Sequence, residues 1–164
     1  ILVKSYSQNK IYVGTKSYDA TSTWMFLKKD KYANYQYDAT LDVTIAKSKN
    51  GGYLMLSTGG VFFETQSIGG TISIYLKDGR VITLTNRLHK DFADEKSTVI
   101  YSVSLAQLNI LKIVDILQIR YNLISSYSKT GFTAQNRYNK SFNLNEYDEG
   151  VYVTSKEINE LFKD

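Results

Sequence analysis

Cysteine and proline are both absent from this chain of 164 residues, and histidine and tryptophan occur once each. Without cysteine there is no disulfide framework, no thiolate zinc site and no cysteine nucleophile. A single histidine excludes most multi-histidine metal sites and leaves only one imidazole to act as the base of a catalytic triad. No run approaches about 18 consecutive apolar residues, so the sequence predicts no transmembrane segment.

Neither basic nor acidic residues are in large excess. The 20 basic and 16 acidic residues give a net charge of +4, and the two signs alternate along the chain. Domains that bind nucleic acid usually concentrate basic residues on one face. The nearest cluster here, at residues 28–31, is interrupted by Asp30. We interpret the charge as a solvated surface, which makes nucleic acid an unlikely partner.

Alternation of apolar and polar residues predicts a β-rich chain. The clearest run spans residues 35–45, where every second residue from Tyr35 to Ile45 is aromatic or aliphatic and the others are polar. This period of two is typical of a strand with one face on a core and one face in water. Further strands are predicted at 17–27, 53–57, 71–77, 80–86, 98–103, 115–124 and 132–137, with a polar loop at 87–97.

The strongest hairpin signal is Asp78-Gly79, which lies between two predicted strands. A two-residue turn would place Ile82 on the opposite face from Ile74, whereas a three-residue loop ending in Gly79 would pair them. Because a slip of one residue turns every side chain to the other face, burial favours the three-residue loop. This register predicts a positive φ at Gly79 and one buried face made of Ile72, Ile74, Leu76, Ile82 and Leu84.

Two short helices complete the predicted fold. Ser104 precedes leucines at helical spacing and is predicted to cap a helix at 105–112. The sequence TSKE that starts at Thr154 has the capping-box pattern and predicts a C-terminal helix at 155–163. We therefore expect a mainly β fold, an antiparallel sandwich or barrel of about eight strands with two short helices. The chain length predicts a single domain over residues 1–164.

One part of the pattern is familiar. Three motifs follow one another between the predicted hairpin and residue 121: Leu76-Lys77-Asp78-Gly79, then Tyr101-Ser102-Val103-Ser104 leading into Gln107-Leu108 and Leu111, then Ile119-Arg120-Tyr121. The pattern resembles small exported bacterial β-rich proteins of unassigned function. The resemblance implies a periplasmic, outer-membrane-associated or secreted protein, and it carries no catalytic residues. The chain starts at Ile1 rather than methionine, which fits trimming by a signal peptidase or by another protease, so a cytoplasmic location stays open.

The polar segment near the only histidine contains candidate metal ligands. His89, Asp91 and Asp94 offer one imidazole and two carboxylates, ligands that suit calcium or manganese. Their spacing matches no ligand template, so the sequence favours a solvated connection. Neither a phosphate-binding glycine loop nor a dinucleotide-binding motif is present. We therefore expect no metal and no cofactor.

The sequence also favours a protein without catalytic activity. It contains no G-x-S-x-G motif, and Asp38 and Asp42 lie four residues apart on one predicted strand. Strand rise separates these carboxylates by about 13 Å. That distance is too long for the paired acids of a glycosidase, which are at most about 9.5 Å apart.

The 14 tyrosines are the positive hint of function, since exposed tyrosine suits recognition of proteins or carbohydrates. We expect a binding surface on the polar face of two neighbouring strands. Two alternatives stay open: a barrel that holds a small apolar ligand in a cavity, and a barrel that stacks single-stranded nucleic acid on tyrosines. The candidate binding residues are Thr21, Thr23, Tyr35, Tyr37, Asp38, Thr40, Asp42 and Thr44.

Overall fold

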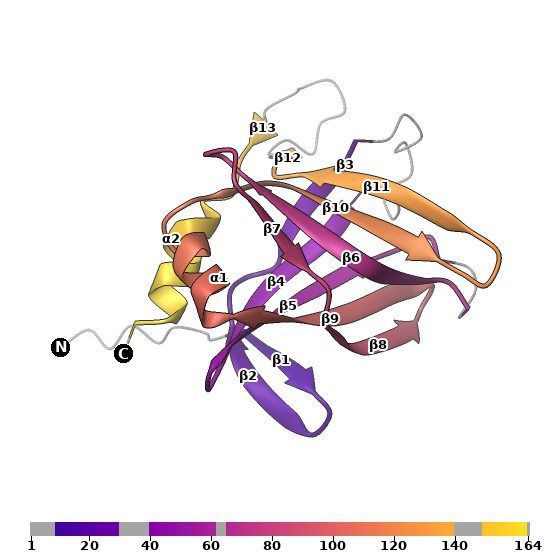
Figure 1. The fold of residues 1–164 in the computed structure, drawn as a ribbon, viewed down its shortest axis with the longest axis horizontal. Helices are drawn as coiled ribbons and strands as arrows, with labels where there is room; N and C mark the ends of the chain where they lie inside the picture. The colour runs from indigo at the N-terminus through magenta and orange to yellow at the C-terminus, as the bar shows by residue number, and fades with distance from the viewer. Residues whose placement is uncertain (1–8, 30–39, 62–64, 140–148, 164) are drawn as a thin grey trace.

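The computed structural model describes residues 9–29, 40–61, 65–139 and 149–163 (Figure 1). These ranges hold thirteen strands and two helices, so the predicted mainly β class with two short helices is confirmed, while the estimate of about eight strands was too low. The strands are β1 Asn9–Val13, β2 Lys16–Ala20, β3 Trp24–Lys28, β4 Thr40–Ser48, β5 Gly51–Thr58, β6 Ser67–Leu76, β7 Val81–Leu84, β8 Arg87–Ala93, β9 Lys96–Ser104, β10 Ile116–Ile124, β11 Lys129–Gln135, β12 Tyr138–Asn139 and β13 Glu149–Gly150. The helices are α1 Leu105–Leu111 and α2 Thr154–Leu161.

Eleven of these strands form one antiparallel sheet, whose main path runs β7-β6-β10-β11-β3-β4-β5-β9-β8. The sheet curls until its two ends approach each other, so the fold is a nearly closed barrel, one of the two predicted architectures (Figure 1). The hairpin β1–β2 stands outside this path and joins it where β2 pairs with β4. Strands β12 and β13 make a separate two-stranded sheet.

Side-chain hydrogen bonds link the two ends of the curled sheet. The Tyr101 hydroxyl on β9 donates to the Gly70 carbonyl of β6 at 2.8 Å. Arg87 on β8 donates through Nη1 to the Ile68 carbonyl, also at 2.8 Å. Burial raises the pKa of Tyr101, which keeps its hydroxyl protonated and able to donate. These bonds hold the barrel together where strand-to-strand pairing stops.

The barrel interior is filled by side chains. Trp24, Phe26, Tyr101 and Tyr121 are almost completely buried there. Leucine, isoleucine and valine side chains from the neighbouring strands pack around these rings and form one continuous core. Contacts among buried rings and aliphatic chains of this kind are typical of a packed protein core.

A second, smaller core lies outside the barrel. The hairpin β1–β2 packs Ile11 and Ala20 against Ala46 on the outer side of β4. Beside them, the rings of Tyr18 and Tyr53 meet edge to face with centroids 4.9 Å apart. Strand β1 was not predicted from the sequence, and its packing covers part of a sheet face that was expected to be exposed.

The register predicted for the hairpin β6–β7 is confirmed. Ile74 pairs with Ile82 and Ile72 with Leu84. Gly79 has a φ of 92°, which glycine adopts without a steric penalty. The five aliphatic side chains expected on one face, Ile72, Ile74, Leu76, Ile82 and Leu84, are all buried.

The cap predicted for the first helix is also confirmed. The Ser104 hydroxyl accepts a hydrogen bond from the Gln107 amide at 3.2 Å, and the Gln107 side chain accepts one from the Ser104 amide at 2.9 Å. Leu108 and Leu111 are buried as expected. Leu105, which shares their helical spacing, is 54% exposed instead.

Replacing Ser104 by alanine should lower the free energy of unfolding by about 1 kcal/mol, because the Gln107 amide then loses its acceptor. Urea denaturation measures this loss. Ser126→Ala is the matched control, since Ser126 is exposed at the β10–β11 turn. Equal stability of the two variants would contradict a capping role for Ser104.

The capping box predicted at the start of the second helix does not form. α2 begins at Thr154 rather than at residue 155, and Val153 precedes it without a side-chain cap. The Thr154 hydroxyl instead accepts a hydrogen bond from the Ile116 amide at 2.9 Å. Glu157 turns toward β3, where it accepts one from Trp24 Nε1 at 2.8 Å. The Thr154 hydroxyl and the Glu157 carboxylate, which a capping box would use, are therefore bonded to other parts of the fold.

Other local predictions were wrong for reasons visible in the packing. Residues 87–97 are not a loop, because most of them form the hairpin β8–β9 with a tight turn at Asp94 and Glu95. The strand predicted at 17–27 is broken into β2 and β3. Strict alternation along the strand predicted at 115–124 is also interrupted, because a bulge in β10 shifts the register, so that Ile116 is buried and Leu117 is exposed.

Candidate functional site

The predicted polar surface on β4 and its neighbours is only partly exposed. Thr21 and Thr44 are each 3% exposed, so the expectation that they face solvent was wrong. Thr23 is exposed, but its hydroxyl lies 3.2 Å from that of Thr44. Thr40 and Asp42 are half-buried, and Asp42 pairs with Lys96 at 3.8 Å. Three other candidates, Tyr35, Tyr37 and Asp38, lie outside the described residues.

Contacts with a neighbouring segment occupy the threonine hydroxyls of this region. The segment between β2 and β3 runs beside β4, where the Thr21 hydroxyl accepts from the Ile45 amide at 3.1 Å. The Thr21 amide in turn donates to the Ile45 carbonyl at 2.9 Å. The hydroxyls of Thr21 and Thr44 are therefore engaged by groups of the protein itself.

The metal candidates do not come together as a site. His89 and Asp91 lie on β8 as exposed residues, and Asp94 lies at the β8–β9 turn with a φ of 52°. Across the part of the chain that the structure describes, no three His, Asp or Glu side chains gather closely enough to hold a metal ion.

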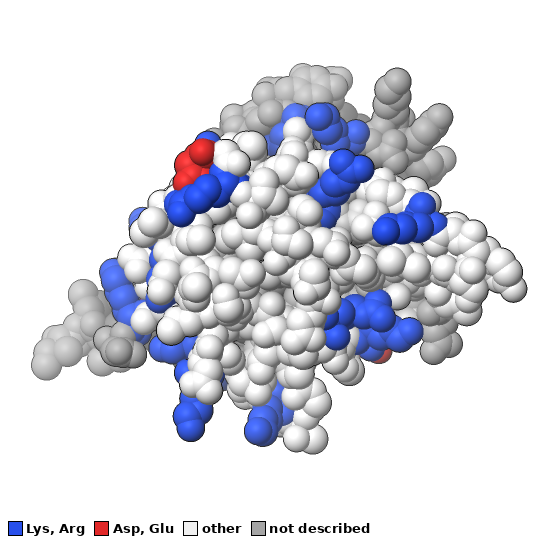
Figure 2. Space-filling view, in the orientation of Figure 1, with Lys and Arg blue, Asp and Glu red and all other residues white. Residues whose placement is uncertain are grey.

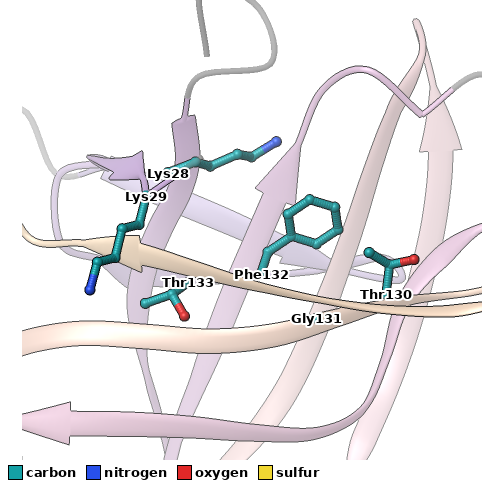
Figure 3. A pocket seen from close by; sticks show the side chains of 6 residues that line it. All are labelled: Lys28, Lys29, Thr130, Gly131, Phe132 and Thr133. Atoms are coloured by element: carbon teal, nitrogen blue, oxygen red, sulfur yellow. The ribbon is translucent and has the colours of Figure 1, made fainter. Parts of the chain in front are cut away.

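A groove of about 330 Å³ lies where β3 ends beside β11. Figure 3 shows the six residues that line it, contributed by the end of β3, by the residue that follows and by the first half of β11. We call it the β3–β11 groove. Its lining residues are Lys28, Lys29, Thr130, Gly131, Phe132 and Thr133.

The two lysines lie on opposite sides of β11. Lys28 Nζ is 5.8 Å from the centroid of the Phe132 ring, a cation–π distance, and that ring stacks on Tyr121 with centroids 5.6 Å apart. Lys29 extends past the other side of the strand, next to Thr133 (Figure 3). Its backbone amide donates to the Thr133 carbonyl at 2.9 Å. Alternation of side chains along the strands produces this division.

Further positive charge lies beside the groove. Arg120 on β10 pairs with Thr133, and its Nη2 atom lies 3.8 Å from the position that a Cβ at Gly131 would take. Lys and Arg side chains are spread over the molecular face in Figure 2, where acidic side chains show at few points. Cationic groups, an aromatic ring and hydroxyls together suit an anionic ligand with an extended shape.

The sequence contained part of this signal. Lys28 and Lys29 were recognised as basic neighbours but interpreted as solvated charge, and Phe132 and Thr133 lie far along the chain. No family model, curated protein or solved structure matches the chain, so its function has to be inferred from its own geometry.

Proposed function

We propose that the protein is a non-catalytic binding domain that holds an anionic partner, a protein segment or a carbohydrate, in the β3–β11 groove. One observation carries the proposal: Lys28 and Lys29 flank the two sides of β11 beside the Phe132 ring. Ammonium groups attract carboxylates or sulfates from either side, and the ring adds an apolar contact. The resemblance noted in the sequence supports an extracytoplasmic setting for this binding. None of the described helices is long and apolar enough to cross a membrane.

The packing of the barrel favours this proposal over the two alternatives. A ligand-holding barrel needs an internal cavity, whereas large rings such as Trp24 and Phe26 fill the interior here. Stacking of nucleic-acid bases needs neighbouring exposed tyrosines. Among the residues that the structure describes, the strongly exposed tyrosines are Tyr12 and Tyr127, at 68% and 99%, and they belong to β1 and to the β10–β11 turn, which lie apart in Figure 1.

Charge reversal in the groove, Lys28→Glu with Lys29→Glu, should weaken binding of an anionic probe by about tenfold or more, because the charge next to the bound anion changes from positive to negative. The probes are a synthetic peptide in which glutamate alternates with valine, here called the Glu-Val peptide, and a chondroitin sulfate oligosaccharide. Isothermal titration calorimetry gives the affinities. Backbone amide shifts of Gly131 and Thr133 in NMR spectra locate the binding.

The matched control is Lys16→Glu with Lys90→Glu, which changes the net charge by the same amount. Both lysines are exposed, on β2 and β8, away from the groove lining. Wild-type protein should bind at least one probe, and the control should keep most of that affinity. The proposal is wrong if neither probe binds, or if the groove and control variants lose affinity equally.

A further inference from the structure

We infer that the anionic partner is an acidic peptide segment that binds in an extended conformation and adds a strand to the edge of β11. This inference rests on the proposed function and names the chemistry of its ligand. Two features of the groove support it: the direction of the β11 backbone groups and the placing of side chains on the two faces of the strand.

The backbone of β11 turns hydrogen-bonding groups into the groove. β11 pairs with β10 along its whole length, from Lys129 to Gln135. On its other side, among the residues that the structure describes, it pairs with β3 only at Ala134 and Gln135. The bond from the Lys29 amide to the Thr133 carbonyl adds one further contact there. β3 then ends, and the first half of β11 lines the groove.

Strand geometry fixes which groups these are. Since the Thr133 carbonyl is directed toward β3, the backbone groups two residues earlier, at Gly131, are directed to the same side. No bulge interrupts the β10–β11 register between them. The Gly131 amide and carbonyl therefore face the groove and can pair with the backbone of an added strand.

The side chains beside this edge match a peptide that carries acidic residues. An added strand directs successive side chains to opposite faces of the sheet. On one face they meet Lys29 and Thr133, where a carboxylate finds an ammonium and a hydroxyl (Figure 3). On the other face they meet the Phe132 ring and Lys28, which suit an apolar or acidic side chain. A carbohydrate has no backbone repeat that matches the strand edge.

Gly131 offers a direct test, because its amide faces away from β10. Gly131→Pro removes that amide, and proline is tolerated on an edge strand where the missing amide served no strand pairing. Gly131→Ala keeps the amide and is the matched control. A Cβ at this position lies 3.4 Å from Asn122 Oδ1, an ordinary van der Waals contact.

The experiment measures binding of the Glu-Val peptide by calorimetry to the folded full chain and to both variants. We expect Gly131→Pro to weaken binding by about tenfold, the effect of one lost backbone hydrogen bond, and to weaken it clearly more than Gly131→Ala, which keeps the amide. A peptide with glutamine in place of glutamate should bind about tenfold more weakly than the Glu-Val peptide. Circular dichroism checks that both variants keep the wild-type fold.

N-methylated peptides provide a second reading on unaltered protein, in case Gly131→Pro disturbs folding. Two peptides are compared, one methylated on every glutamate amide and the other on every valine amide. One of them should lose binding and the other should keep it, because only alternate amides face β11. Equal binding of both methylated peptides, or full affinity of a folded Gly131→Pro variant, overturns strand addition. Binding of chondroitin sulfate but not of the peptide overturns it too, while leaving the proposed function intact. Failure of both probes overturns both proposals.

Discussion

Replacing Trp24 by alanine should lower the free energy of unfolding by about 4 kcal/mol. The indole is 1% exposed, on β3 in the middle of the barrel wall. Its Nε1 donates to a carboxylate oxygen of Glu157 at 2.8 Å, and the other oxygen of that carboxylate accepts from the Ser22 amide. The change therefore removes a large core side chain and one of the two hydrogen bonds of a partly buried carboxylate.

Two milder variants separate these contributions. Trp24→Phe keeps an aromatic ring but loses the Nε1 donor. Glu157→Gln removes the charge and replaces one of the two acceptor oxygens by an NH2 group, which then faces an N–H donor. We expect each to cost about 1.5 to 3 kcal/mol, the usual range for a hydrogen bond to a charged group. Urea denaturation followed by circular dichroism measures all three variants.

The control is Met25→Ala at the neighbouring position on the same strand. Met25 is 50% exposed, so its truncation should change the free energy of unfolding by no more than about 0.5 kcal/mol. If Trp24→Ala were no more destabilising than this control, burial of the indole would contribute little to the free energy of unfolding. The contact between β3 and α2 would then contribute little as well.

Local sequence predicted those elements whose stability is decided locally. The β6–β7 register followed from the pairing of Ile74 with Ile82, which burial of a single hairpin face determines. The cap at Ser104 followed because its partner, Gln107, lies within the same turn of helix. Both groups of the pattern at Thr154 and Glu157 were drawn instead into contacts with β10 and β3, and no local rule could anticipate that.

The candidate site shows the same division. The polar face of β4 was correctly expected to alternate with Leu41, Val43 and Ile45, which are buried. What covers Thr44 comes from another segment, so its burial could not be derived from the β4 sequence alone. The groove likewise depends on β3 ending next to β11, which brings Lys28 to Phe132. Pairing of strands distant in sequence, rather than residue type, decides where the positive charges meet the ring.

Replacing Asn136 by aspartate should destabilise the protein by about 4 kcal/mol at neutral pH. The Asn136 amide group donates to the Ile116 carbonyl at 2.7 Å and to the Tyr152 carbonyl at 2.8 Å, and its oxygen accepts from the Tyr152 amide at 2.9 Å. The residue is 5% exposed. An introduced carboxylate cannot donate, so it would face two carbonyl oxygens with a buried negative charge, a cost typical of an uncompensated charge.

The penalty should depend on pH in a direction that the geometry fixes. Burial and the two carbonyls disfavour the charged form, so the pKa of the introduced carboxyl is higher in the folded than in the unfolded chain. The folded state then binds the extra proton first, and the deficit relative to wild type shrinks as the pH falls through the folded-state pKa. Asn136→Ala, which carries no titrating group, should show a deficit of about 2 kcal/mol that does not vary with pH.

Urea denaturation at pH 7 and at pH 4.5 distinguishes these outcomes. Asn86→Asp serves as the surface control, because Asn86 is exposed between β7 and β8 and the same change of charge there should cost no more than about 0.5 kcal/mol. A deficit for Asn136→Asp that is as small as this, or that grows on acidification, would mean that the side chain does not join β10 to the segment leading into α2. A large deficit that shrinks in acid supports the connection. The hydrogen bonds of Asn136 would then hold the end of β11 to β10 and to the segment that leads into α2.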